Sequence, residues 1–133
     1  MHILLDTNIC IYMIKNNPPE VRKHFEKHQI GDIGISTITI AELEYGVQKS
    51  KAKERNKDAL QSFLLPLEFL SFDDASAVAY GKIRSNLELK GTPIGSMDML
   101  IAAQAIAHNC VLVTHNLKEF ARIDNLRLET WVK

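Results

Sequence analysis

Short apolar runs of strand length alternate with longer segments of helical periodicity along most of the chain. This alternation is typical of βαβ units, in which helices connect the strands of a parallel sheet. The sequence therefore predicts an α/β fold. Strands are expected at residues 2–5, 32–36, 67–72 and 111–114, with a weaker signal at 127–131.

Helix boundaries are marked by residues that favour helix starts and ends. Prolines 18 and 19 separate two short helices, because proline suits a helix start and disfavours its interior. Asp73 or Asp74 is expected to cap a long helix that ends at Gly91, a residue that tolerates the left-handed conformation. The predicted helices cover residues 9–15, 21–28, 38–50, 53–65, 74–90 and 96–107.

Length and charge limit the number of domains and the kinds of partner. The chain has 133 residues, and no repeat or linker divides it, so residues 1–133 are expected to form one domain. Lysine plus arginine and aspartate plus glutamate number 16 each, which excludes a global basic field. A polyanion would have to be held by a local patch or by metal ions.

The two cysteines, Cys10 and Cys110, lie far apart in the sequence and outside any metal-binding spacing. The sequence contains no secretory signal and no apolar stretch long enough to cross a membrane. We therefore expect a cytoplasmic protein with reduced thiols and no membrane association.

The first acidic residue, Asp6, directly follows the apolar run Ile3-Leu4-Leu5. Ligands of α/β sheets collect at the carboxyl ends of strands, so Asp6 is a candidate site residue. Aspartate is also a common N-cap, and Asp6 precedes a helical pattern. This segment alone supports both interpretations.

Three further acids, Glu42, Asp98 and Glu119, stand where predicted strands and helices meet. Each has an ordinary explanation as a surface charge or as a first-turn acid that complements the helix dipole. If they converge with Asp6, like charges about 4 Å apart repel by about 4 kcal/mol at an effective dielectric near 20. Such a cluster requires a cation or raised pKa values, and Mg²⁺, with Mn²⁺ as the alternative, suits oxygen ligands. His24 and His28 have no evident third ligand and are expected on a solvated face.

Four segments together resemble the PIN-domain ribonucleases, and within them the VapC toxins of bacterial toxin–antitoxin pairs. The resemblance covers essentially the whole chain, and the four segments occur in the order of the family. They are Leu5-Asp6-Thr7-Asn8, Ser36-x-x-Thr39-x-x-Glu42-x-x-x-Gly46, Gly91-x-Pro93-Ile94-Gly95-x-x-Asp98-x-x-Ile101-Ala102-Ala103, and Leu112-Val113-Thr114-x-Asn116-x-x-x-Phe120.

The resemblance implies a three-layer domain with a parallel sheet in the order 3-2-1-4-5 and helices on both faces. A switch between strands 1 and 4 would place Asp6 at the crevice where ligands bind. The resemblance also implies that Asp6, Glu42 and Asp98 bind the divalent metal. Among the supporting residues, Thr7 and Asn8 would shape the first turn, and Ser36 and Thr39 would orient the acids by hydrogen bonds.

One position departs from the family pattern. Many members carry a fourth acid where this chain has Asn116, whose amide oxygen is a neutral and weaker magnesium ligand. Glu119 lies about one turn later if this segment is helical, and would supply the missing charge. Glu119 is therefore included among the expected catalytic residues.

The reaction implied by the resemblance is hydrolysis of an RNA phosphodiester by a metal-activated water, which leaves 5′-phosphate and 3′-hydroxyl ends. The implied substrate is transfer RNA, cut in the anticodon region. The implied partners are a VapB-like antitoxin, in a heteromeric complex, and a second copy in a homodimer. Ile11, Tyr12 and Phe63 are candidates for these contacts and equally for the core.

The densest basic segment, residues 49–57, is a candidate RNA contact through Lys51 and Arg55. The alternative for this segment is an exposed helix junction that lysine keeps soluble. Lys82, Arg84 and Lys90 on the long helix are expected to form the opposite wall. Two other functions remain open: a catalytically silent PIN-like binding module, and a magnesium-dependent phosphatase. The phosphatase normally needs a second aspartate where this chain has Asn8.

Overall fold

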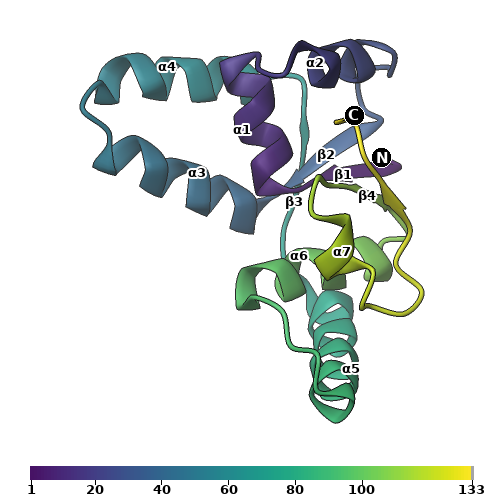
Figure 1. The fold of residues 1–133 in the computed structure, drawn as a ribbon. Coiled ribbons are helices and arrows are strands. Elements are labelled where there is room, and N and C mark those ends of the chain that lie inside the picture. Colours follow the sequence, from purple (N-terminus) through teal and green to yellow (C-terminus); the bar gives the residue numbers. More distant parts are fainter. Residues whose placement is uncertain (133) are drawn as a thin grey trace.

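The computed structural model describes residues 1–132, which form five strands and seven helices. All strand pairs are parallel, and their order in the sheet is β3-β2-β1-β4-β5, as predicted (Figure 1). The chain turns from one side of β1 to the other when it enters β4, which puts the topological switch between these two strands. The strands are β1 (Ile3–Leu5), β2 (Ile33–Ser36), β3 (Glu68–Leu70), β4 (Val111–Val113) and β5 (Leu128–Glu129).

Helices cover both faces of the sheet, which confirms the three-layer prediction (Figure 1). The first four helices pack over one face, and the last three pack over the other. The helices are α1 (Thr7–Lys15), α2 (Pro19–Glu26), α3 (Thr37–Lys49), α4 (Lys53–Leu64), α5 (Asp74–Lys90), α6 (Ser96–Ala107) and α7 (Leu117–Phe120).

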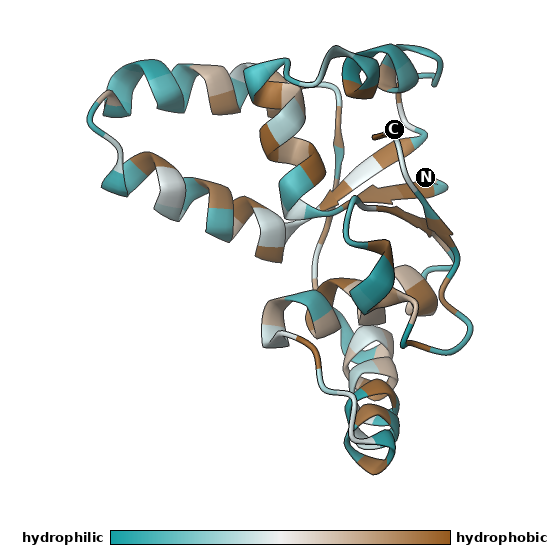
Figure 2. Ribbon diagram, in the orientation of Figure 1, coloured by the Kyte–Doolittle hydropathy of each residue, from teal (hydrophilic) through white to brown (hydrophobic). Residues whose placement is uncertain are grey.

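Alternation along β1 divides the core in two. Ile3 and Leu5 join the cluster under α1 to α4, whereas Leu4 joins the cluster formed with α5, α6 and α7. Successive side chains of a strand point to opposite faces, so a central strand must be apolar throughout. Figure 2 shows the central strands mostly in brown and much of α4 in teal.

Several boundaries differ from the prediction for local reasons. Helix α1 begins at Thr7, two residues early, because Asp6 already caps it. Strands β3 and β5 are shorter than predicted, and both lie at the sheet edges, where each has one neighbour. Helix α7 is a single turn that the sequence indicated only conditionally.

The prediction of a solvated face for His24 and His28 was wrong. Both are half-buried, and both rings stack on the indole of Trp131, at centroid distances of 5.8 and 5.6 Å. Trp131 itself is 1% exposed. The two histidines therefore help to bury the C-terminal segment against α2.

The caps predicted for α5 are confirmed. Asp73 accepts a hydrogen bond from the Ser76 amide at 2.9 Å, and Gly91 closes the helix in the left-handed conformation. Ile11, Tyr12 and Phe63 are partly buried against the core. Within residues 1–132, no helix combines the length and the apolar character needed to cross a membrane.

Candidate active site

Asp6 and Thr114 follow β1 and β4 at the switch of the sheet. The Asp6 side chain is 4% exposed, and its two oxygens have different partners. The Ile9 amide donates to Oδ1 at 2.9 Å, and the Thr114 hydroxyl donates to Oδ2 at 2.5 Å. Asp6 is therefore the N-cap of α1, as one interpretation of the sequence predicted, and its carboxylate is held in place at the carboxyl end of β1.

Glu42 approaches this edge from α3. The Thr7 hydroxyl donates to Glu42 Oε1 at 2.7 Å and also lies 3.3 Å from Thr39 Oγ1. Because Thr7 is the residue next to Asp6, this contact ties the start of α1 to the acid on α3. Thr7 therefore orients Glu42 directly, and Thr39 contributes through Thr7.

Asp98 lies in the first turn of α6, which begins after the Gly95 N-cap. Its pKa is raised to about 6, first by burial and then by the negative charges of Glu119, Asp6 and Glu42. These causes show that the four predicted acids, contributed by separate segments of the chain, share one electrostatic environment. An acid cluster of this kind favours binding of a cation.

Glu119 is held by donors from two segments. The Gly95 amide donates to Oε1 at 3.2 Å, and the Asn116 side-chain amide donates to Oε2 at 2.9 Å. These two hydrogen bonds lower the pKa of Glu119 below its ordinary value. Glu119 is thus ionised and links the turn after β4 to the start of the helix that carries Asp98.

The pKa of Asp6 is raised, because the penalty of burial exceeds the opposing effects. The Thr114 hydroxyl is the largest of these opposing influences, followed by the Ile9 amide and the charge of His115. Thr114 in turn accepts a hydrogen bond from the Asn116 amide at 3.0 Å. The turn after β4 therefore positions Asp6 as well as Glu119.

The donor set suits a hard divalent cation, because it consists of carboxylate oxygens. Each carboxylate has about four lone-pair sites, so hydrogen bonding to the protein leaves acceptor capacity free. In the described part of the chain, no three histidine, cysteine, aspartate or glutamate side chains stand close enough together to hold a metal as they are. Mg²⁺ usually keeps several waters and is bound by one or two carboxylates, so it does not need three protein ligands in contact at once.

The remaining supporting residues have local roles. Ser36 caps α3 by accepting a hydrogen bond from the Ile38 amide at 3.0 Å, so it orients Glu42 through the helix and not by a direct contact. Asn8 is exposed in the first turn of α1, and its amide is hydrogen-bonded to Asp6. Sequence reasoning assigned no role to Thr114 or His115. Their place directly after an apolar strand, as for Asp6, was the signal that could have identified them.

The expected basic residues do not form two facing walls. Lys51 is exposed in the turn between α3 and α4, and Arg55 is exposed in the first turn of α4, whereas Glu42 lies near the middle of α3. Lys82 lines a cavity with Asn86 and Asp124. Two residues along a helix correspond to about 200° of rotation, so Arg84 lies on the other side of α5 from Lys82. The prediction that Lys82 and Arg84 share one wall was therefore wrong.

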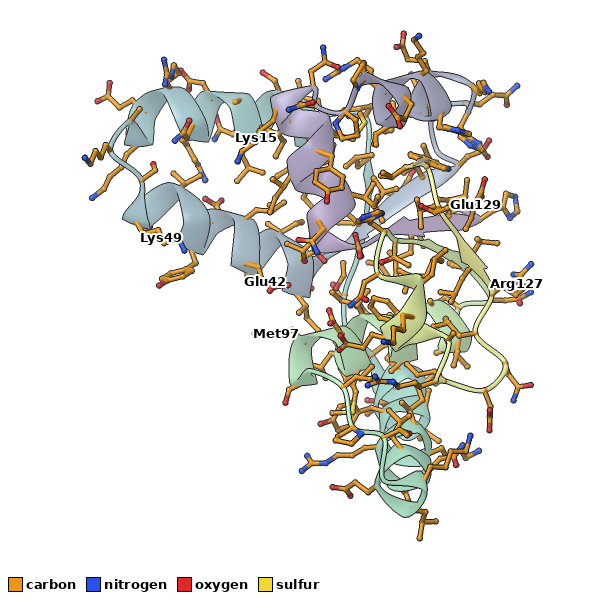
Figure 3. The ribbon with its side chains drawn as sticks, viewed as in Figure 1. Lys15, Glu42, Lys49, Met97, Arg127 and Glu129 are labelled. Carbon is orange, nitrogen blue, oxygen red and sulfur yellow. The ribbon has the colours of Figure 1, made fainter. Side chains whose placement is uncertain are left out.

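The guanidinium of Arg84 already has partners within the protein. It donates to the Tyr80 hydroxyl at 3.2 Å and lies 3.6 Å from a Glu88 oxygen. These contacts hold the side chain along α5. In Figure 3, Glu42 on α3 and Met97 on α6 lie on either side of the space between these two helices, and Lys49 lies further along α3.

Known proteins are similar to this chain over most or all of its length. Residues 3–126 match the PIN domain family. Ribonuclease VapC2 of Rickettsia felis is 48% identical over all of both chains. The tRNA(fMet)-specific endonuclease VapC of Salmonella typhimurium is 44% identical over 98% of both.

Solved structures agree with the sequence comparison. The crystal structure of DNA-bound VapBC from Salmonella typhimurium superimposes with a TM-score of 0.94 and 43% identity, over 99% of each chain. VapBC2 from Rickettsia felis, bound to a DNA fragment from the promoter, gives a TM-score of 0.92 and 47% identity over 99% of this chain and 100% of that one. The chain belongs to the PIN-domain family and, within it, to the VapC ribonucleases.

Proposed function

We propose that this protein is a divalent-metal-dependent endoribonuclease that cuts transfer RNA in the anticodon region. The observation that carries the proposal is that Asp6, Glu42 and Glu119 lie near enough to Asp98 for their charges, after burial, to contribute to raising its pKa to about 6. Relatives at 44% and 48% identity are named for ribonuclease activity, one of them for tRNA(fMet). The full acid set argues against a catalytically silent binding module.

Asp6, Glu42 and Asp98 would hold Mg²⁺, with Mn²⁺ as the alternative. When bound, such a cation lowers the pKa of water and stabilises negative charge that develops on the leaving oxygen. The chain's own contribution is positioning. Thr114 fixes Asp6 and Thr7 fixes Glu42, so two of the three acids are oriented before substrate arrives.

Glu119 has a different part in this proposal. Both of its oxygens accept hydrogen bonds, from Gly95 and from Asn116, so it steadies the start of α6 next to Asp98. Its negative charge adds to the attraction for a cation. The neutral Asn116 acts through Glu119 and Thr114, to which it donates its side-chain and backbone N–H groups respectively.

We also propose that a VapB-like antitoxin binds this chain, as the VapBC assemblies of its relatives suggest. An apolar groove of about 410 Å³ runs between α1, α3 and α4, and Glu42 and Lys15 are among its lining residues. Its apolar walls include Ile11, Ile14, Leu43, Val47 and Leu60. A peptide with apolar side chains and a cation near Glu42 would fit this lining.

The test is to sequence transfer RNA ends after brief expression of the wild-type chain and of Asp98→Ala. We expect new 5′-phosphate and 3′-hydroxyl ends within the anticodon region, present only with the wild-type chain. Purified protein should lose activity with a chelator and with Asp6→Asn. Ends with 2′,3′-cyclic phosphate would contradict the proposal, because they indicate attack by the ribose hydroxyl.

A magnesium-dependent phosphatase is the alternative enzymatic function. Position 8, where that class needs its second aspartate, is an exposed asparagine. A phosphorylated intermediate trapped at Asp6 would support the phosphatase and overturn the nuclease proposal.

A further inference from the structure

Three side chains of α3 form a stripe that leads away from the acid cluster. Glu42, Tyr45 and Lys49 follow the spacing i, i+3, i+7, which places them within about 60° of one another around the helix. Tyr45 lies about 4.5 Å and Lys49 about 10.5 Å beyond Glu42 along the helix axis. The stripe therefore begins at a candidate metal ligand and ends at a cation.

Tyr45 is unusually open for an aromatic residue on a packed helix. Its side chain is 66% exposed, and it is the one large apolar residue on α3 that is exposed among those the structure describes. In residues 1–132 its hydroxyl makes no hydrogen bond. Its recorded contact is with Lys49, whose Nζ lies 5.2 Å from the ring centroid. The fold therefore gains little from keeping an aromatic ring at this position.

The charge balance of the chain explains why an RNA-cutting site would need such a ring. The protein has no excess of basic residues, and four acids crowd the site, so phosphate is not attracted by a general positive field. Base stacking on an aromatic ring requires no net charge and contributes to binding in proteins that hold single strands. Lys49 has no carboxylate partner within the described residues, so its ammonium is available to a phosphate.

We propose that Tyr45 is a stacking platform for a base of single-stranded RNA next to the cleaved bond, and that Lys49 contacts an adjoining phosphate. This inference rests on the proposed function and names how its substrate is held. An aromatic ring beside a cation is the combination by which proteins bind single strands. Tyr45 is a positioning residue in this scheme, because it binds a base away from the reacting atoms.

A second copy of the chain is a poorer match than RNA as the binding partner of this stripe. The centres of protein interfaces are depleted of lysine and glutamate, yet these residues flank the ring on both sides. Tyr45 also provides the only large exposed apolar surface on α3 in the described chain. RNA, which carries bases and phosphates in alternation, matches a ring followed by a cation.

The test measures RNA binding separately from cleavage. Fluorescence anisotropy would follow an anticodon-arm stem-loop RNA on the full chain carrying Asp6→Asn, and cleavage kinetics would use the chain with Asp6 intact. We expect Tyr45→Ala to raise Kd and KM about tenfold with kcat nearly unchanged. Tyr45→Phe should stay within about twofold, since it keeps the ring. The matched control is Leu89→Ala, which removes an 86% exposed apolar side chain from α5.

Removing one loop base at a time from the RNA identifies the stacked nucleotide. At that position, the abasic RNA should bind more weakly, and Tyr45→Ala should cause no further loss. Lys49→Gln should reduce the slope of log K against log salt by about one. A structural role for Tyr45 would not produce this dependence on a single base.

Each other outcome is decisive. Unchanged Kd in Tyr45→Ala, or an equal loss in Leu89→Ala, overturns the inference while leaving the nuclease proposal intact. Binding without cleavage in any metal contradicts the nuclease proposal alone, and Kd still tests the stacking. Loss of a dimer in sedimentation at unchanged Kd assigns the stripe to a second copy. If the chain that carries only Asp6→Asn does not bind the RNA, both proposals are contradicted.

Discussion

The side-chain amide of Asn116 donates to Glu119 Oε2 at 2.9 Å, so a neutral residue supports a carboxylate three positions later. The other Glu119 oxygen accepts from the Gly95 amide. The Asn116 backbone amide donates to Thr114, which holds Asp6. One neutral residue thereby acts on two acids without being a strong metal ligand.

Asn116→Ala should lower kcat/KM about tenfold, because Glu119 loses a hydrogen bond to a charged group worth about 1.5–3 kcal/mol when well made. The backbone donation to Thr114 persists in this variant. Steady-state cleavage at several metal concentrations checks the prediction, and we expect more metal to be needed for half-maximal rate. Unchanged metal dependence would show that Glu119 needs no support from Asn116.

Asp6→Asn separates the two roles of Asp6. Asparagine is as good an N-cap as aspartate, so α1 should keep its cap while the carboxylate is lost. We expect abolished cleavage together with unchanged or increased thermal stability of the metal-free protein, because a buried charge is removed. Asp6→Ala should also lose activity, and it should be less stable than Asp6→Asn by about 1 kcal/mol. Equal stability of the two variants would contradict the capping role.

The alternation of apolar runs with helical segments predicted an α/β fold with a parallel sheet. The strand order and the three layers were implied by the family resemblance, because short apolar runs do not show which strands are neighbours. Local signals such as Asp73 and Gly91 also predicted the ends of α5 correctly. The edge strand β5 was less predictable, since its short length depends on contacts with one neighbour. Likewise, the burial of His24 depends on Trp131, a residue far along the chain that no local pattern connects with it.

Within the site, the sequence indicated the acids but not their contacts. Strand ends and helix starts identified Asp6 and Asp98, because parallel strands bring such positions to one edge. The contact of Thr7 with Glu42 joins residues 35 positions apart, and it depends on how α3 crosses α1. The separation of Lys82 from Arg84 was readable from helix periodicity, which places residues two apart on different faces.

Thr7→Val should reduce activity about tenfold, because the hydroxyl that orients Glu42 is replaced by a methyl group of similar size. Thr7→Ser keeps the hydroxyl and should retain most activity. Thermal unfolding should change little in either variant, since Thr7 is only half-buried. Comparable losses of activity in the valine and serine variants would show that the methyl group, and not the hydrogen bond, matters.

The ionisation of Asp98 should lower the stability of the metal-free protein as the pH rises from about 4 to about 6. In the folded state the pKa of Asp98 is about 6, above its ordinary value of 3.8. The folded chain therefore binds more protons than the unfolded chain in this interval, and the free energy of unfolding falls as Asp98 ionises. Denaturant unfolding at a series of pH values, with a chelator present, measures this decline.

Asp98→Asn should flatten the pH dependence, leaving the smaller contribution of Asp6, whose pKa is also raised. Adding Mg²⁺ at neutral pH should stabilise the wild-type chain more than Asp98→Asn, because a ligand that binds only the folded state shifts the unfolding equilibrium. An equal effect of Mg²⁺ on both chains would place the cation elsewhere. A decline that persists in full in Asp98→Asn would show that another group titrates, since burial and the three neighbouring charges act on Asp98 itself.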